Sequence, residues 1–237
     1  MIIKNTGSFF VGHLEDRSVP EKDREKLMSL ANEEFADELA DMLEEAFPIA
    51  DPVVLFGVCP VSSDTQQVSV NGIVIPSDLA YDKLKDKKRC FPYICTCGTA
   101  LEEWSKQYAG DLLAEYWADE IKKYFLMRIR MELIPWLKEH YKTGTHLPSL
   151  NPGSIAAWPI SGQAELFAIL GGREFVEAQT GVVYTPSYLM LPSKSVSGIA
   201  FESETFYENC QYCPIDNCPG RRAKRIGKTI FEEILSC

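Results

Sequence analysis

Apolar residues recur at intervals of three and four along two long stretches of the chain, a spacing that predicts amphipathic helices. The first stretch covers residues 21–47, and we expect its helix to stop before Pro48. Its apolar positions are Leu27, Leu30, Ala31, Phe35, Leu39, Met42, Leu43 and Ala46. The second stretch covers residues 99–142. Because one helix of that length is unusual in a compact domain, we expect breaks near Gly110 and Pro135.

Shorter runs rich in β-branched and aromatic residues predict strands between and after these helices. They lie at residues 53–56, 67–75, 90–97, 182–184, 188–191 and 196–201. Within the second run, Asn71-Gly72 favours a tight hairpin turn. The segment 146–154 contains two prolines and a glycine, which we expect to exclude regular structure. Helices and strands together indicate an α+β fold.

Length, composition and charge restrict the class of protein. The 237 residues correspond to one large domain or two small ones, and 46% apolar with 24% charged residues is typical of a globular chain. A net charge of −10 repels a phosphate backbone, so nucleic acid is not an expected partner. The chain has no apolar run long enough to span a membrane and no leader-like start. We therefore expect a cytoplasmic protein without a membrane partner.

The eight cysteines are the first lead to chemistry, because thiols that cluster in a reducing compartment favour metal or redox sites over disulfides. Cys210, Cys213 and Cys218 form a Cys-x2-Cys-x4-Cys run near the carboxyl end. Soft sulfur ligands suit zinc or an iron–sulfur cluster, so the run predicts a metal centre. Candidates for a fourth ligand are Cys95, Cys97 and Cys237. The alternative is that the three cysteines are free or oxidised thiols.

The remaining chemistry-bearing residues give weaker signals. Cys95 and Cys97 end a predicted strand and precede a helix start, where the helix dipole favours a thiolate. Cys59 and Cys90 lie in apolar settings and are predicted to be buried as small hydrophobic residues. The sequence contains no nucleophile elbow, no phosphate-binding loop and no dinucleotide fingerprint. We therefore assign no catalytic residue.

Two blocks of sequence carry a resemblance to a known family. The first comprises residues 151–154, Ala156-Ala157-Trp158-Pro159 and residues 164–171. The second comprises residues 181–192 and Ser195-Val196-Ser197-Gly198. These blocks resemble the reactivation domain of cobalamin-dependent methionine synthase, where the second block typically reads Thr-Glu-Ser-Tyr-Ala-Met-x-Pro and Ser-Val-Ser-Gly. Upstream, residues 76–79 and 93–102 resemble more divergent, stand-alone relatives of that domain. The resemblance covers roughly residues 30–207.

The resemblance implies a C-shaped α+β domain built around a twisted antiparallel sheet. It would occupy residues 1–207, with a cysteine-rich tail, residues 208–237, packed on it. In the family, this domain binds S-adenosylmethionine beside the cobalamin module, so that cob(II)alamin can be reduced and remethylated. This chain contains no cobalamin-binding or catalytic module of its own, so the corrinoid would be carried by a partner.

The resemblance also places a ligand site. The family loop reads Arg-x-x-x-Gly-Tyr, and aligning Gly153 with its glycine puts Ser149 at the arginine and Ser154 at the tyrosine. The implied cofactor-binding residues are Ser149, Asn151, Gly153, Ser154, Phe206 and Tyr207. Serine cannot replace a bidentate arginine–carboxylate contact, so we predict weak or absent binding of adenosylmethionine. We further expect the loop 148–159 to lie across a cleft bordered by the strand 197–201.

These observations lead to two hypotheses of different classes. The first is a stand-alone reactivation-type accessory protein for a corrinoid-dependent methyltransferase system, with an iron–sulfur or other metal centre that assists reduction or remethylation of the corrinoid. The alternative is a binding module without a redox step, which recognises a corrinoid protein or a small ligand and holds structural zinc. A methyltransferase proper is disfavoured by the missing glycine-rich loop. The identity of the metal distinguishes the first two.

Overall fold

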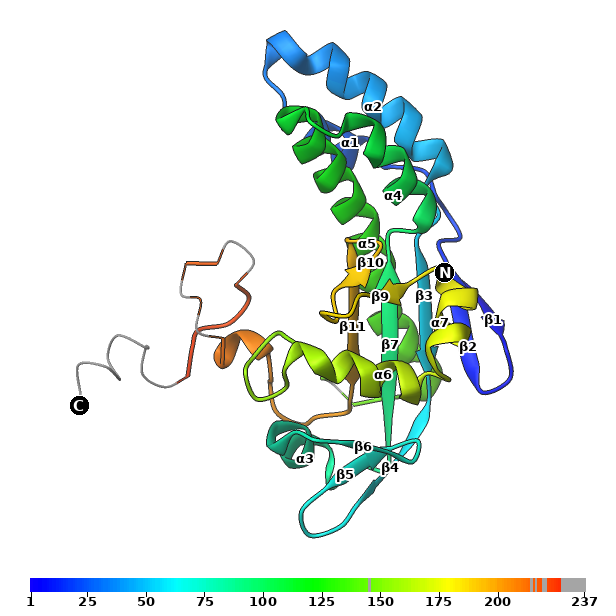
Figure 1. Cartoon of the computed structure of the whole chain (residues 1–237), viewed down its shortest axis with the longest axis vertical. Coiled ribbons are helices and arrows are strands. Elements are labelled where there is room, and N and C mark those ends of the chain that lie inside the picture. Colours follow the sequence, from blue (N-terminus) through cyan, green and yellow to red (C-terminus); the bar gives the residue numbers. More distant parts are fainter. Residues whose placement is uncertain (145, 214, 216, 219–220, 227–237) are drawn as a thin grey trace, which may run out of the picture. The chain divides into compact units, whose positions relative to one another are not determined.

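The computed structural model describes residues 1–144, 146–213, 215, 217–218 and 221–226. The chain divides into two compact units, each assembled from three stretches. Figure 1 labels their helices and strands. Unit 1 comprises Met1–Phe56, Ile94–Leu137 and Gly171–Val196, and unit 2 comprises Gly57–Tyr93, Lys138–Leu170 and Ser197–Cys237. The strand pairs with a described register are all antiparallel, which confirms the α+β prediction with an antiparallel sheet. A boundary after residue 207 stays a prediction.

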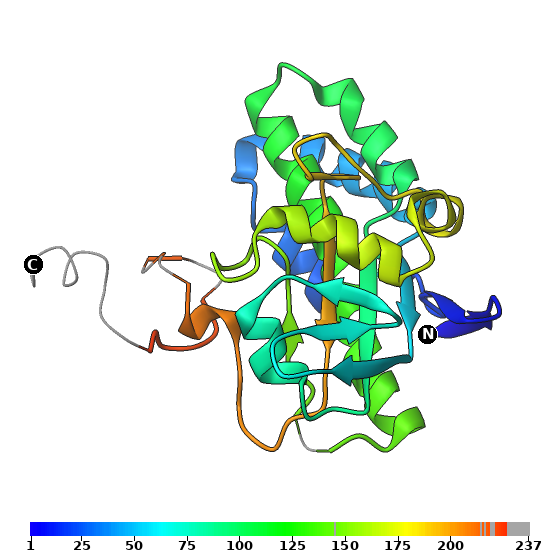
Figure 2. The same cartoon turned by 60° about the horizontal axis from the view of Figure 1, so that its bottom comes forward.

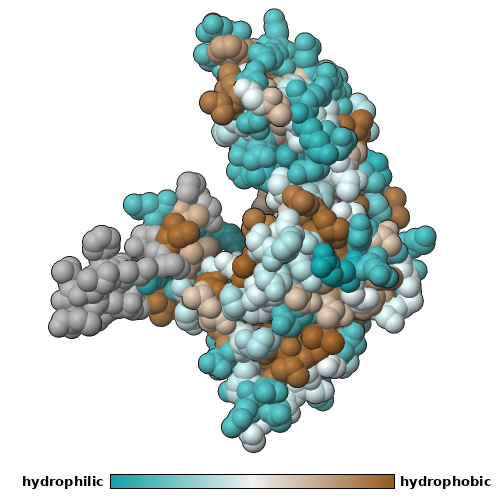
Figure 3. Space-filling model, in the orientation of Figure 1, coloured by the Kyte–Doolittle hydropathy of each residue, from teal (hydrophilic) through white to brown (hydrophobic). Residues whose placement is uncertain are grey.

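Unit 1 carries most of the helices. They are α1 (Glu21–Met28), η1 (Glu33–Phe35), α2 (Ala36–Ile49), α4 (Thr99–Ser105), η2 (Lys106–Tyr108), α7 (Arg173–Thr180) and most of α5 (Leu112–Tyr141), whose residues 138–141 belong to unit 2. The stretch predicted as one helix over 21–47 is thus interrupted, because the Asn32 side chain accepts a hydrogen bond from the Phe35 amide and starts a new helical segment there. Figure 3 shows a largely hydrophilic outer surface over the helices of this unit.

Two prolines lie inside helices, contrary to our expectation. The helix α2 continues past Pro48, and α5 continues past Pro135, whereas the predicted break at Gly110 is confirmed. Leu133 and Leu137, on either side of Pro135, are fully buried. Burying two leucines contributes about 3–6 kcal/mol, which offsets the roughly 3 kcal/mol that a proline costs inside a helix. Packing therefore outweighs the local penalty.

The strands of unit 1 are β1 (Ile2–Asn5), β2 (Phe9–His13), β9 (Val183–Tyr184), β10 (Met190–Leu191) and β3 (Val53–Gly57). The strands β1 and β2 form a hairpin that the sequence did not predict, and β9 pairs with β10. In the described part of the chain, no helix combines the length and the apolar character needed to cross a membrane.

Unit 2 is built on a small antiparallel sheet. Its elements are β4 (Cys59–Ser63), β5 (Val68–Val70), β6 (Ile73–Ile75), α3 (Asp78–Leu84), β8 (Ser149–Leu150), η3 (Ile160–Gly162), α6 (Gln163–Ile169) and η4 (Asn209–Gln211), with parts of β7 (Arg89–Thr96) and β11 (Ser195–Ala200). The strands follow the order β7-β4-β5-β6, and Figure 2 shows β4, β5 and β6 side by side. The predicted hairpin at Asn71-Gly72 is confirmed, with positive φ at both residues.

The loop 146–154 contains a short strand, which corrects our expectation that its prolines exclude regular structure. Residues Ser149 and Leu150, between Pro148 and Pro152, form β8 and pair with β11. Two residues need few ladder hydrogen bonds, so prolines on either side are tolerated. The residues that follow this loop are bonded to α3, because the Ser77 hydroxyl caps that helix and donates to the Ala157 carbonyl (2.7 Å).

Ser77 is expected to contribute measurably to stability through these two contacts. Ser77→Ala removes the cap of α3 and leaves the Ala157 carbonyl without this donor, so we expect a loss of about 1–3 kcal/mol in the free energy of unfolding. Urea denaturation followed by circular dichroism measures it. Ser63→Ala, which removes an exposed hydroxyl that donates to the Lys85 carbonyl, is the matched control and should cost under about 0.5 kcal/mol. Equal losses in the two variants would contradict this assignment.

Candidate functional site

The loop 148–159, which we expected across a cleft bordered by the strand 197–201, contacts β11 directly at its first residues. Leu150 is paired with Ile199, and the Phe201 amide donates to the Pro148 carbonyl (3.0 Å). At Gly198 the contact is so close that a Cβ atom would meet the Leu150 carbonyl oxygen at 2.6 Å. Glycine is therefore required there. Where we expected a cleft, loop and strand are in contact at this point.

The Asn151 side chain, 7% exposed, is the centre of the contact between loop and strand. Its Nδ2 donates to the Ser197 carbonyl (2.6 Å) and to the Tyr93 hydroxyl (3.1 Å). The Tyr93 hydroxyl is also hydrogen-bonded to Ser149 Oγ (2.9 Å). These bonds connect the loop to both β7 and β11.

The C-terminal segment completes the same network. Asn209 Nδ2 donates to Asn151 Oδ1 (2.8 Å), and the Tyr207 hydroxyl donates to Asn209 Oδ1 (2.8 Å). On the other side, the Ser197 hydroxyl donates to Gln163 Oε1 (2.8 Å). We name this set the amide cluster; its members are Tyr93, Ser149, Asn151, Gln163, Ser197, Tyr207 and Asn209. Because a buried polar group without a partner costs about 1–3 kcal/mol, the members hold one another in place.

The amide cluster is electrically neutral. Desolvation on burial raises the pKa of the Tyr207 hydroxyl well above its usual value, with smaller contributions from Tyr212 and Glu208, so Tyr207 remains a neutral donor. The ammonium of Lys83 lies over the Tyr207 ring at 5.5 Å and is paired with Asp82 at 2.9 Å. A neutral cluster with its donors and acceptors directed at one another is suited to holding segments together.

The six residues implied by the resemblance divide into three groups. Ser149, Asn151 and Tyr207 belong to the amide cluster. Gly153 and Ser154 form the adjoining turn, in which the Gly153 amide donates to the Trp158 carbonyl and the Ser154 amide to the Asn151 carbonyl. Phe206 is 58% exposed. Its side chain is therefore available to a partner, whereas that of Tyr207 is not.

Sequence reasoning did not select four members of the cluster as site residues. Ser197 lies inside the second block that carries the family resemblance, and Tyr93 begins the upstream stretch 93–102, so their positions were a usable signal. Gln163 begins α6, and Asn209 directly precedes Cys210. Nothing in the local pattern of either residue indicates burial, since amides are mostly exposed.

The residues present do not fit the carboxylate of adenosylmethionine. Ser149, which the resemblance aligns with the family arginine, uses its hydroxyl in the hydrogen bond with Tyr93. No member of the amide cluster carries a positive charge. A carboxylate placed here would lose its hydration without gaining a charge-assisted bond, which is costly.

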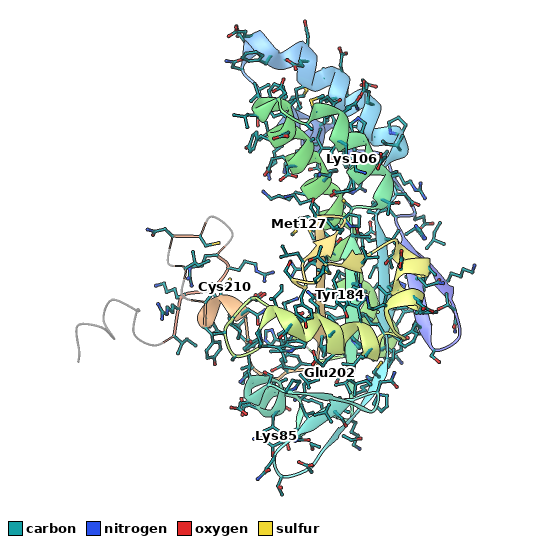
Figure 4. The ribbon with its side chains drawn as sticks, in the orientation of Figure 1. Lys85, Lys106, Met127, Tyr184, Glu202 and Cys210 are labelled. Atoms are coloured by element: carbon teal, nitrogen blue, oxygen red, sulfur yellow. The ribbon has the colours of Figure 1, made fainter. Side chains whose placement is uncertain are left out.

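In the cysteine segment, residues 208–226, one guanidinium bonds several of the described residues 208–213, 215, 217–218 and 221–226. Arg221 donates to the carbonyl oxygens of Cys210 (2.7 Å) and Cys213 (3.2 Å), and also to that of Ile215. The Arg222 amide donates to Cys210 Sγ at 3.5 Å. Figure 4 labels Cys210 in the η4 turn that begins the segment.

The predicted metal centre is not confirmed. Cys210 and Cys213 are half-buried and Cys218 is exposed. Within the described ranges, no three or more His, Cys, Asp or Glu side chains are grouped so that they could hold a metal ion. Cys237 lies outside the described residues. The centre at Cys210, Cys213 and Cys218 stays a prediction.

Our expectation of a thiolate at Cys95 or Cys97 is wrong. Both side chains are fully buried, and desolvation raises the pKa of each thiol to about 12. Burial therefore outweighs the favourable helix dipole, and neutral thiols of this kind are poor candidates for a fourth ligand. The prediction that Cys59 and Cys90 are buried is confirmed, and desolvation raises their pKa values too.

Comparisons with known proteins identify the fold. No protein-family model matches the sequence, and no curated protein matches it. Among solved structures, the chain is similar to the MetH reactivation domain bound to AdoHcy, with a TM-score of 0.58 and 14% sequence identity. The match covers 81% of this chain and 70% of that chain. The chain has the fold of the MetH reactivation domain, which confirms the fold that the resemblance implied.

We expect adenosylmethionine to bind weakly or not at all. Losing an arginine–carboxylate pair costs on the order of 2–5 kcal/mol, or roughly 30-fold to several-thousand-fold in affinity. Titration calorimetry with adenosylmethionine and with AdoHcy measures this, and an equal deficit for both ligands is expected because both carry the same carboxylate. A dissociation constant in the low micromolar range for either ligand would show that another group recognises the carboxylate.

Proposed function

We propose that this chain is a reactivation-type accessory protein for a corrinoid-dependent methyltransferase system, acting on a corrinoid carried by a partner protein. The observation that carries the proposal is its fold, which is that of the MetH reactivation domain over 81% of the chain. That neighbour is described with AdoHcy bound, which favours a place for this chain in methyl-transfer chemistry. We also propose a cytoplasmic location without a nucleic-acid partner; the net charge of −10, which repels a phosphate backbone, supports the second of these.

The site supports a role in presenting a shaped surface to a partner. The amide cluster fixes the loop 148–159, the strand β11 and the start of the cysteine segment relative to one another. Beside the buried Tyr207, Phe206 exposes 58% of its surface, and Tyr212 exposes 44%. Exposed aromatic residues on a rigid frame are typical anchors of protein interfaces. The partner that fits the proposal is a corrinoid-binding protein.

Binding to a corrinoid protein tests the proposal. The purified chain is titrated with a corrinoid-binding methyltransferase module, loaded either with cob(II)alamin or with no corrinoid. We expect a dissociation constant of about 1–50 μM for the loaded module and weaker binding of the empty one. Phe206→Ser should weaken binding about ten-fold through loss of an aromatic anchor.

Ile2→Ser in β1 is the matched control for this experiment, since Ile2 is 59% exposed and Phe206 is 58% exposed. It should change the affinity less than about two-fold, within the range usual for residues outside an anchor. Failure of the loaded module to bind, or equal losses in the two variants, would count against the proposal.

A second candidate is a binding module without a redox step, in which the cysteines hold structural zinc. The observation that favours it is the neutral, mutually satisfied amide cluster, which holds segments together but supplies no electron carrier. An iron–sulfur centre at the three cysteines is the added element that electron delivery to the corrinoid would require. The hydrogen bond from the Arg222 amide to Cys210 Sγ supports such a centre, because hydrogen bonds to the ligand sulfurs stabilise their negative charge.

Metal analysis separates the two candidates. Cys213→Ser is purified anaerobically beside the parent, and iron, sulfide and zinc are quantified. Because thiolates bind such metals at about 2.3 Å and the variant lacks one of three ligands, we expect a selective loss of metal with the domain still folded. Iron and sulfide in the parent would support electron delivery, and zinc would support the binding module. Unchanged metal content in the variant would end the metal hypothesis.

A further inference from the structure

Asn209 connects the cysteine segment to the loop 148–159. It directly precedes Cys210 in the chain, and its side chain is only 7% exposed. Its Nδ2 donates to Asn151 Oδ1 at 2.8 Å, and its Oδ1 accepts from the Tyr207 hydroxyl at 2.8 Å. A residue of the cysteine segment is thus bonded on both sides inside the amide cluster.

The described residues of the cysteine segment beyond Asn209 form hydrogen bonds with one another. Arg221 donates to the Cys210 and Cys213 carbonyls, and the Ile226 amide donates to the Gln211 carbonyl at 2.8 Å. Arg222 forms an ion pair of 2.9 Å with Glu208. Because these contacts join Cys210 and Cys213 to the described residues 221–226, fixing the η4 turn also restricts the half-buried Cys210 and Cys213.

We propose that Asn209 is a positioning residue that holds the thiols of Cys210 and Cys213 beside the loop 148–159, so that loop and thiols form one site. In this arrangement the side-chain oxygen of Asn151, a residue of the loop, is occupied by its hydrogen bond from Asn209. The role of Asn209 does not depend on a corrinoid partner, because its bonds to Tyr207 and Asn151 are present whichever of the two proposed functions the chain has.

The proposal predicts a selective change in thiol reactivity. Alkylation of a half-buried cysteine requires local opening of its segment, and the population of the open form rises when a fixing contact is removed. Asn209→Ala removes two buried hydrogen bonds. We expect iodoacetamide to alkylate Cys210 and Cys213 about ten-fold faster in this variant than in the parent.

The intact native chain is alkylated for set times and then digested, and the modified fraction of each cysteine is measured by mass spectrometry of its peptide. Cys218, which is exposed, should react at the parental rate because it needs no opening. The buried thiols that report global unfolding are Cys59, Cys90, Cys95 and Cys97, and they should stay unreactive. Ser203→Ala, which removes an exposed hydroxyl bonded to the Thr205 carbonyl, is the matched control and should change the rates less than about two-fold.

Two further variants distinguish positioning from general destabilisation. Asn209→Asp keeps the volume and the acceptor for Tyr207 but loses the donor to Asn151, so it should give the same selective acceleration. Asn151→Ala should accelerate the same two cysteines, and the double variant with Asn209→Ala should fall short of the product of the single effects, because both remove the same bond. Parallel acceleration of the four buried thiols, or rates within about two-fold of the parent in both Asn209 variants, would overturn the proposal.

Discussion

The side chain of Asn151 receives hydrogen-bonding partners from three segments of unit 2. Its amide nitrogen donates to Ser197 in β11 and to Tyr93 in β7, and its amide oxygen accepts from Asn209. Each of these groups is removed from water, so each requires its partner in place. The position of the loop, the strand and the cysteine segment depends on this one buried amide. Gly198 leaves room for the Asn151 side chain, since a Cβ atom at position 198 would collide with the side-chain amide nitrogen of Asn151.

The neutrality of the amide cluster has functional consequences. A site built to bind a carboxylate or a phosphate requires fixed positive charge, and the cluster offers hydroxyls and amides that are already bonded to one another. The chain thus has the fold of the MetH reactivation domain, while the described members of its amide cluster include no positively charged side chain. Two chains with 14% sequence identity can share a backbone fold, whereas the chemistry of a site depends on the side chains that the fold carries.

The described cysteines differ in burial, and burial decides whether their thiols can react. Four of them are enclosed in the core, where desolvation raises the pKa and removes the thiolate. Cys210, Cys213 and Cys218 are at least partly exposed and lie on a segment shaped by Arg221. Chemistry at sulfur is therefore confined, among the described cysteines, to the C-terminal segment.

The sequence by itself determined the features that depend on neighbours along the chain. The turn at Asn71-Gly72 and the break at Gly110 are set by the backbone preferences of single residues, and two short blocks sufficed to indicate the fold. Tertiary structure alone decided that α5 continues through Pro135, and that the amides of Asn151 and Asn209, 58 positions apart in sequence, bind one another. Local preferences act over a few residues, whereas burial and hydrogen-bond partners are supplied by segments that only folding brings together.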